Sequence, residues 1–179
     1  TPEDAKGLIV TAIEDPNPVL YFEHKHLYRR IKAEVPEERY TTPFGKARIQ
    51  REGEDVTVVT WGAMVYTAAE AAQQLEQDDV SVEILDLRTI IPWDRKAVLD
   101  SAQKTSKVLV LHEDTRTGGF GGEIAATIAE EAFEQLDAPI VRITTPHIPL
   151  PSAAVLEDLA LPSVDRIVET VKRRLDDAA

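Results

Sequence analysis

The fold of this chain is decided by residues 81–133, SVEILDLRTIIPWDRKAVLDSAQKTSKVLVLHEDTRTGGFGGEIAATIAEEAF. This stretch predicts an apolar strand over Val82 to Leu85, an amphipathic helix over Asp94 to Gln103 and a second buried strand over Val108 to Leu111. A glycine-rich turn then leads into another helix, Gly122 to Leu136. Two successive strand–helix units of this kind predict a parallel sheet.

The same alternation continues on both sides of this stretch. Further strands are predicted over Ala47–Arg51, Val56–Trp61 and Ile140–Ile143, and further helices over Ala63–Gln77 and Ser163–Leu175. Because strands alternate with helices, we expect an α/β fold, a three-layer αβα arrangement with a mostly parallel five-stranded sheet. The expected sheet core consists of Val56, Val58, Val82, Ile84, Val108, Val110, Ile140 and Val141.

The N-terminal part predicts a remnant of another domain. A helix begins at Thr1-Pro2-Glu3-Asp4, because a hydroxyl N-cap and a proline at the first helical position favour a helix start. It ends near Ile13, since neither proline of Asp15-Pro16-Asn17-Pro18 can extend a helix. Val19 to Phe22 then predicts a buried strand, and the charged stretch from Glu23 to Phe44 predicts a linker. We therefore expect a helix–strand remnant of an upstream domain (1–23), a linker (24–46) and a C-terminal domain (47–179). Since the sequence opens with neither Met nor a signal peptide, we expect a fragment of a longer protein.

The composition narrows the class of protein. A total of 20 Lys and Arg against 32 Asp and Glu gives a formal net charge of −12, which argues against nucleic-acid binding. This charge fits either a solvated acidic surface or a basic protein partner. The absence of cysteine excludes disulfides and thiolate metal sites, and fits a cytosolic protein. No apolar run approaches the ~18 residues of a membrane span, so no membrane partner is expected.

Several polar residues lie where the predicted strands end. His112-Glu113-Asp114 suggests either a general acid–base histidine or, as we favour, a histidine paired with local carboxylates. Asp86 and Arg88 are expected to form an ion pair that fixes their turn. His24 and His26 lack a third metal ligand, so an exposed basic patch is expected there.

The glycine-rich turn, Gly118 to Gly122, precedes a predicted helix, where backbone N–H groups could hold a phosphate. Its spacing fits neither the G-x-G-x-x-G fingerprint nor the P-loop, and Glu123 in the first helical turn would repel an anion. We therefore favour close backbone packing where two domains or two subunits meet.

The sequence resembles one protein family over nearly its whole length. The resemblance is carried by Trp61-Gly62, Asp86-Leu87-Arg88-Thr89, Ile91-Pro92-Trp93-Asp94 and Thr117-Gly118-Gly119-Phe120. These motifs resemble the C-terminal, transketolase-like domain of the β subunit of the thiamine-diphosphate-dependent 2-oxo acid dehydrogenases, the E1 component. Within that family they look most like the branched-chain (2-oxoisovalerate) enzyme. His147 stands where the family usually has Asp, so an acidic contact at that loop is not expected.

The resemblance implies a division of labour between subunits. Together with an α subunit, such a β subunit oxidatively decarboxylates a 2-oxo acid, branched-chain or pyruvate, on thiamine diphosphate and acylates the lipoyl domain of E2. The α subunit holds the pyrophosphate and Mg²⁺, and the β subunit's N-terminal pyrimidine-binding domain supplies the activating carboxylate. Only residues 1–23 of that domain are expected here. We therefore assign no catalytic and no cofactor-binding residue to this chain, and expect it to be inactive alone.

The resemblance also implies a partial metal site and two interfaces. The family can hold a structural K⁺ at positions that correspond to Ala12, Asp15 and Asn17. The C-terminal domains of the family's β subunits pair around a two-fold axis and offer acidic groups to the basic subunit-binding domain of E2. The candidate interface residues, apolar anchors first and the acidic tail second, are Trp93, Phe120, Asp176, Asp177 and Ala179.

Other functions stay open at this point. The chain could be the terminal domain of another transketolase-like enzyme, such as transketolase or deoxyxylulose-phosphate synthase, or a free-standing binding module without a catalytic partner. The coding sequence upstream of Thr1 would discriminate among these functions. The expected location is the bacterial cytoplasm, or the mitochondrial matrix if the source is eukaryotic.

Overall fold

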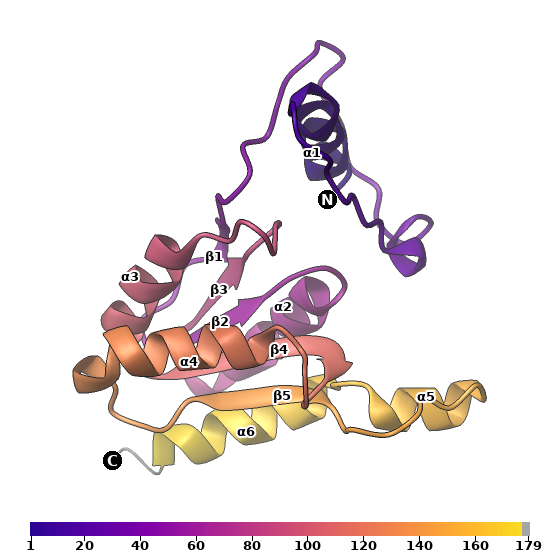
Figure 1. Cartoon of the computed structure of the whole chain (residues 1–179). Coiled ribbons are helices and arrows are strands. Elements are labelled where there is room, and N and C mark those ends of the chain that lie inside the picture. The colour runs from indigo at the N-terminus through magenta and orange to yellow at the C-terminus, as the bar shows by residue number, and fades with distance from the viewer. Residues whose placement is uncertain (177–179) are drawn as a thin grey trace.

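The computed structural model describes residues 1–176, with side chains to residue 175 (Figure 1). Its centre is one five-stranded sheet in the order β1-β3-β2-β4-β5. The edge strand β1 runs antiparallel to β3, and the other neighbouring strands are parallel. The strands are β1 (Arg48–Arg51), β2 (Val56–Thr60), β3 (Val82–Asp86), β4 (Val108–Thr115) and β5 (Val141–Thr145). The predicted mostly parallel sheet is confirmed.

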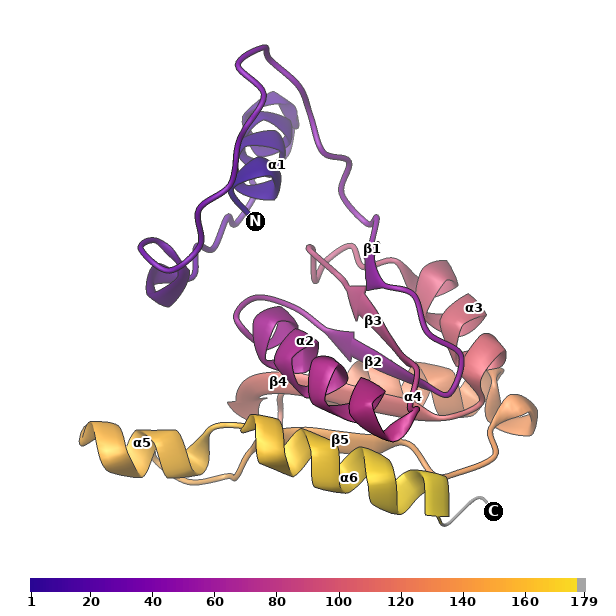
Figure 2. The same ribbon diagram turned by 180° about the vertical axis from the view of Figure 1, so that it is seen from behind.

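Helices cover both faces of the sheet, as Figures 1 and 2 show from opposite sides. α2 (Met64–Leu75) and α6 (Val164–Asp176) pack together on one face, over an apolar cluster that includes Val58 and Ile84. α3 (Arg95–Thr105) and α4 (Gly121–Glu131) cover the other face, where the cluster includes Val110. The three-layer αβα arrangement is therefore confirmed.

The predicted core lies mainly in the central strands. Six of its residues are at most 4% exposed, namely Val56, Val58, Val82, Ile84, Val108 and Val110. Ile140 and Val141 are only half-buried, because β5 is an edge strand and Ile140 precedes it.

Three details of the elements differ from the prediction. β4 continues to Thr115, where it pairs with Thr145 of β5, so it includes His112. The helix predicted to reach Leu136 ends at Glu131 and is followed by the 3₁₀ turn η3 (Phe133–Gln135), and another 3₁₀ turn, η2 (Glu76–Asp78), follows α2. A short helix, α5 (Ala154–Ala160), was not predicted, since its seven residues are too few to show a helical period. Among the described residues, no helix has both the length and the apolar character needed to cross a membrane.

The N-terminal segment stands apart from the sheet (Figure 1). α1 (Pro2–Glu14) begins as predicted, with the Thr1 hydroxyl accepting a hydrogen bond from the Asp4 backbone N–H at 3.1 Å. The strand predicted over Val19–Phe22 is wrong. The segment pairs with no strand of the described chain and leads into the 3₁₀ turn η1 (Lys25–Leu27).

Candidate functional site

The carboxyl edge of the sheet gathers the buried polar residues of the predicted site. Asp86 ends β3, Trp61 follows β2, and His112 lies in the second half of β4. This is the edge at which open α/β sheets place ligands. The N-terminal segment reaches the same edge, where Asp4 pairs with Arg48 and Arg88 and His24 pairs with Glu113.

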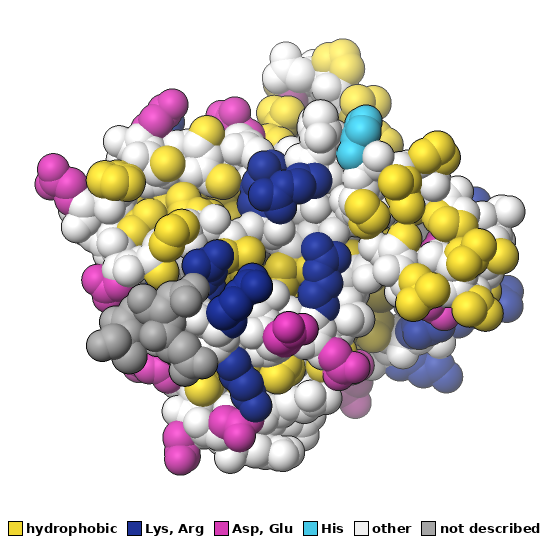
Figure 3. All heavy atoms as spheres, turned by 90° about the horizontal axis from the view of Figure 1, so that it is seen from below, with side chains coloured by type: hydrophobic (Ala, Val, Ile, Leu, Met, Phe, Trp, Pro, Cys, Tyr) yellow, Lys and Arg dark blue, Asp and Glu magenta, His cyan; other side chains and the backbone are white. Residues whose placement is uncertain are grey.

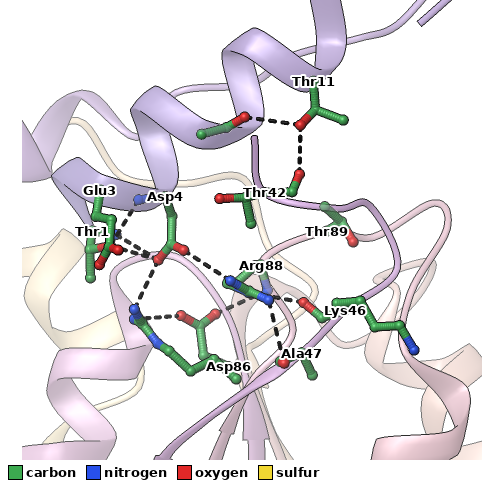
Figure 4. A network of polar contacts seen from close by, with 12 residues as sticks. Thr1, Glu3, Asp4, Thr11, Thr42, Lys46, Ala47, Asp86, Arg88 and Thr89 are labelled. Atoms are coloured by element: carbon green, nitrogen blue, oxygen red, sulfur yellow. Dashed lines mark hydrogen bonds and ion pairs between the residues drawn. The ribbon is translucent and has the colours of Figure 1, made fainter. Parts of the chain in front are cut away.

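Four charged residues join α1 to this edge, and we call them the Asp4 clasp: Asp4, Arg48, Arg88 and Asp86 (Figure 4). The Arg88 guanidinium donates to Asp4 Oδ1 at 3.1 Å, and Arg48 Nη1 lies 3.2 Å from Asp4 Oδ2. Asp4 is only 6% exposed. Burial alone would raise the pKa of Asp4, but the Thr1 hydroxyl and the two guanidinium groups hold it below its usual value. The clasp therefore keeps a buried carboxylate ionised between α1 and the sheet.

The expected ion pair between Asp86 and Arg88 is wrong. The backbone N–H of Arg88, not its side chain, donates to Asp86 Oδ1 at 3.0 Å. Arg88 has a φ of +58°, a left-handed conformation, and its guanidinium reaches Asp4 and the Lys46 carbonyl. Asp86 pairs instead with Arg48 at 3.5 Å. Burial raises the pKa of Asp86, an effect that the Arg88 N–H and Arg48 only partly offset.

His112 does not pair with the neighbouring carboxylates, contrary to the prediction. Its ring is 1% exposed and stacks on Trp61, with ring centroids 5.2 Å apart. Neither ring nitrogen has a hydrogen-bond partner in the structure. Burial is the main reason that the pKa of His112 is lowered, and Arg142 lowers it further while Asp114 opposes both. The environment favours a neutral imidazole used for packing.

The glycine-rich turn packs against this histidine. A Cβ atom at Gly119 would lie 2.7 Å from the imidazole of His112, and one at Gly121 would collide with Nε2 of the same ring. Only a residue without a side chain fits at these two positions. The predicted close backbone packing is present, and the part of it that the structure shows lies within the chain, against His112.

His24 reaches the sheet edge from the linker. Its Nε2 lies 2.7 Å from Glu113 Oε2, with both side chains about one-third exposed. The ring of His26 lies 6.0 Å from that of His24. The part of the chain that the structure describes contains no group of three or more His, Cys, Asp or Glu residues placed to hold a metal ion. His24 therefore tethers the linker to β4, whereas the rest of the expected basic patch, Lys25, His26, Arg29 and Arg30, is exposed.

The three residues of the expected K⁺ site lie at the C-terminal end of α1. Asp15 caps the helix, and its Oδ1 accepts from the backbone N–H of Asn17 at 2.9 Å and from the Asn17 side chain at 3.0 Å. The carbonyl of Ala12 lacks its usual helical donor, because the residue four positions on is Pro16. The segment thus offers backbone oxygens at the negative end of a helix dipole.

The structure describes the side chains of only two of the predicted interface residues, Trp93 and Phe120. Trp93 and Phe120 are half-buried and pack edge-to-face with ring centroids 6.1 Å apart, and Phe120 also contacts Trp61 at 6.2 Å. They also pack against the core cluster under α3 and α4, and their role at a subunit contact stays a prediction. The side chain of Asp176, together with Asp177 and Ala179, lies outside the described residues.

Sequence reasoning missed an apolar groove of about 660 Å³ beside α4, which runs along the segment leading into β5. Phe133, at one end of it, is 72% exposed. A signal was present in the sequence, since Gly122, Ala125, Ala126 and Ala129 recur at helical spacing without a charge among them.

The comparisons with known proteins agree with this fold. Residues 45–167 match the family model described as the transketolase C-terminal domain. Among solved structures, the chain is similar to one titled "Split gene transketolase, inactive beta4 tetramer", with a TM-score of 0.70 and 25% identity over 83% of this chain and 48% of that chain.

Curated relatives include β subunits of several enzymes, of which three are from Bacillus subtilis (strain 168). The chain is 47% identical over 98% of its length to 2-oxoisovalerate dehydrogenase subunit beta. It is 46% identical over 99% to acetoin:2,6-dichlorophenolindophenol oxidoreductase subunit beta, and 40% identical over 98% to pyruvate dehydrogenase E1 component subunit beta. The chain spans about half the length of these relatives, 54%, 52% and 54% respectively.

Proposed function

The chain belongs to the transketolase C-terminal domain family, and from this membership we propose that it is the C-terminal part of the β subunit of a thiamine-diphosphate-dependent 2-oxo acid dehydrogenase. The observation that carries the proposal is the 47% identity, over 98% of the chain, to a 2-oxoisovalerate dehydrogenase β subunit. In this role the chain assembles the E1 component with an α subunit and a second β subunit, and contributes to docking E2.

Thiamine diphosphate, when bound with Mg²⁺ in the complete enzyme, supplies the carbanion chemistry that a 2-oxo acid needs to lose CO₂. We propose that the residues of this chain stabilise the fold of the subunit and do not contact the reacting atoms. Its buried charges, such as Asp4 and Asp86, are paired within the fold, and His112 is enclosed by Trp61 and the glycine turn. We therefore propose that the chain alone is inactive.

We further propose that residues 1–23 are the end of an upstream domain whose main part this sequence does not include. Leu20 and Phe22 support this, since they are 85% and 87% exposed on an extended segment that pairs with no strand of the described chain. Such side chains are suited to one face of a missing sheet. The linker then spans residues 24–46, and the C-terminal domain residues 47–179.

The K⁺ site stays a proposal at Ala12, Asp15 and Asn17. Its support is the Ala12 carbonyl, which Pro16 leaves without a helical donor, together with the partial negative charge at the end of α1. The remaining ligands would come from outside the chain.

Docking of the basic subunit-binding domain of E2 is proposed for the tail residues Asp176, Asp177 and Ala179. The last described turn of α6 carries Arg173 and Arg174, so an acidic surface there would rest on the tail alone. The net charge of −12 would still steer a basic partner towards the molecule.

The substrate is proposed to be a branched-chain 2-oxo acid. An acetoin-cleaving enzyme is the second candidate, because the identity to that β subunit, 46%, is nearly as high. The two candidate substrates differ in the group attached to the carbonyl carbon, which is a carboxylate in a 2-oxo acid and a hydroxyethyl group in acetoin. The proposed location is the bacterial cytoplasm or the mitochondrial matrix.

The test joins the chain to its upstream region and an α partner, and compares turnover of 2-oxoisovalerate, pyruvate and acetoin. We expect 2-oxoisovalerate to be preferred and the 179-residue chain to show neither turnover nor calorimetric binding of thiamine diphosphate. Micromolar cofactor binding by the chain alone would contradict the proposed division of labour. Preference for acetoin would select the second candidate.

A further inference from the structure

The exposed cations of the linker have no role in the proposed function. They lie in residues 25–32, which we call the basic segment, and they are Lys25, Arg29, Arg30 and Lys32. All four side chains are exposed. Figures 1 and 2 show this part of the chain, around η1, projecting at one side of the molecule below α1.

The basic segment is held to the domain by its inner side. The backbone N–H of Leu27 donates to the His24 carbonyl at 2.9 Å, and that of Ile31 donates to the Leu27 carbonyl at 3.2 Å, so the chain forms helical turns here. The Leu27 side chain packs against the apolar cluster shared by α2 and α6. Lys25 and Arg29 lie two positions before and after Leu27, and in a helical turn they therefore point away from the domain.

The cations of the basic segment differ from most others in the molecule. On the face that α6 borders, which Figure 3 shows from below, Lys and Arg side chains lie beside Asp and Glu side chains. Within residues 1–175, no ion pair and no side-chain hydrogen bond involves the four cations of the basic segment. Their neighbour Glu23 accepts a hydrogen bond from the Tyr28 hydroxyl at 2.8 Å instead.

This arrangement opposes the folded turn unless an anion is bound. Helical turns bring residues four positions apart next to each other, here Lys25 and Arg29, and like charges at this spacing repel. The repulsion persists although the chain carries 32 acidic residues and a net charge of −12. An anionic partner would remove it, because each cation would gain a counter-charge.

The extent of the positive charge indicates the kind of anion. Glu23 precedes the basic segment and Glu34 follows it, so the positive charge covers only a short stretch of chain. A nucleic acid would need a longer basic stripe and would be repelled by the net charge of −12. Arginine guanidinium groups, in contrast, bind single carboxylates through paired hydrogen bonds.

An extended acidic peptide also matches the spacing of the cations. Side chains two positions apart on an extended backbone share one side and lie ~6.5 Å apart. Residues four positions apart on a helical turn, such as Lys25 and Arg29, have Cβ atoms ~6 Å apart. Carboxylates at alternate positions of a peptide would therefore face successive cations.

We propose that the basic segment binds a short acidic segment of a partner protein, with carboxylates at alternate positions of an extended backbone. Tyr28, 57% exposed within the basic segment, offers an aromatic surface to the side chains between the carboxylates. The inference goes beyond the proposed function, since this partner is acidic, whereas the domain proposed to dock at the C-terminal tail is basic.

The experiment titrates the 179-residue chain into a short labelled peptide in which glutamate alternates with serine, and follows fluorescence anisotropy. We expect saturable binding that weakens about tenfold in Arg29→Glu. Arg173→Glu, at an exposed position of α6, makes the same change of charge outside the basic segment and is the matched control. It should leave the affinity within about twofold of the wild-type value. The same peptide with glutamine in place of glutamate should not bind.

A nuclear magnetic resonance titration of the wild-type chain locates the site without any substitution. The backbone amide signals of residues 24–32 should shift more than those of the sheet. Absence of saturable binding, shifts confined to other residues, or equal weakening in Arg29→Glu and Arg173→Glu would overturn the proposal.

Two further comparisons distinguish an acidic peptide from other partners. Pyrophosphate and a single-stranded DNA oligonucleotide should each bind more weakly than the peptide, and tighter binding of either would replace the proposed peptide site with a general anion site. The peptide should also bind the longer protein that includes the upstream region. Loss of binding there would show that the upstream region covers the basic segment, and would likewise overturn the proposal. None of these results affects the proposed enzymatic role, which is measured separately by turnover with the α partner present.

Discussion

At the residue scale, the surroundings of His112 lead to a prediction about pH. Its pKa is lowered chiefly by burial, so the unfolded chain, with an ordinary value of about 6.5, takes up the proton first as the pH falls. The contribution of His112 to stability is thus full above about pH 6.5 and is lost as the pH falls further.

We expect the urea concentration at the unfolding midpoint to drop between about pH 7.5 and 5.5, and to drop less in His112→Asn. His147→Asn, at an exposed histidine, should keep the wild-type pH dependence, and an equal loss of slope in both variants would contradict this account.

The two glycines at the start of α4 give a matched pair of substitutions at the same scale. Gly121→Ala should destabilise the chain by ~1–3 kcal/mol, because the new methyl group would overlap the imidazole of His112. Gly122→Ala should cost less than ~0.5 kcal/mol or stabilise, since its nearest neighbour is 3.4 Å away and alanine favours a helix. Urea unfolding of both variants measures the difference, and equal effects would mean that contact with His112 does not determine the choice of glycine.

Residue-level chemistry was the part that the sequence predicted least well. The turn after β3 and the charges of Asp86 and Arg88 are local features, but the partner of Arg88 is Asp4, 84 positions away. No local pattern encodes such a pairing. The prediction for His112 was wrong for the same reason, since the ring of Trp61 and the glycines that enclose it come from other segments.

At the scale of elements, the Asp4 clasp should control how α1 is held. Asp4→Asn removes the charge between Arg48 and Arg88 and leaves two guanidinium groups facing each other at a buried site. We expect hydrogen exchange in α1 to accelerate by about tenfold or more, while exchange in β4 stays unchanged. Asp15→Asn, at the other end of the same helix, is the control and should not accelerate exchange in the first turns of α1. Unchanged exchange in Asp4→Asn would show that other contacts, such as Thr42 with Gly7, hold the helix.

Helices and strands were predicted correctly where the residues of the segment itself indicate that it is buried. β2 is a run of Val and Thr, and β3 is apolar except for Glu83 and Asp86; both strands are buried along their whole length. Val19 to Phe22 carries the same local signal but pairs with no strand here, since a strand needs a neighbour that the pattern cannot supply. The opposite error occurred at α5, where a helix is present that the sequence did not predict, because seven residues are too few to show a clear helical period.

At the scale of the whole molecule, the exposed segment tests whether a larger domain precedes this one. Leu20→Ser combined with Phe22→Ser should change the unfolding free energy of the 179-residue chain by less than ~0.5 kcal/mol, because both side chains are already exposed. In the longer protein that we propose, the same side chains would lie in the core of the upstream domain. There the double substitution should cost several kcal/mol, of the order of ~2–5 for each buried apolar side chain removed, and should reduce the yield of folded complex with the α partner.

Thermal unfolding and co-purification of both forms give the comparison. Ile91→Ser, 87% exposed on the C-terminal domain, serves as the control for a general effect of removing surface hydrophobics. If the double substitution proved equally harmless in the two forms, residues 19–22 would not be part of a missing sheet, and the division of the chain near residue 23 would have to be abandoned.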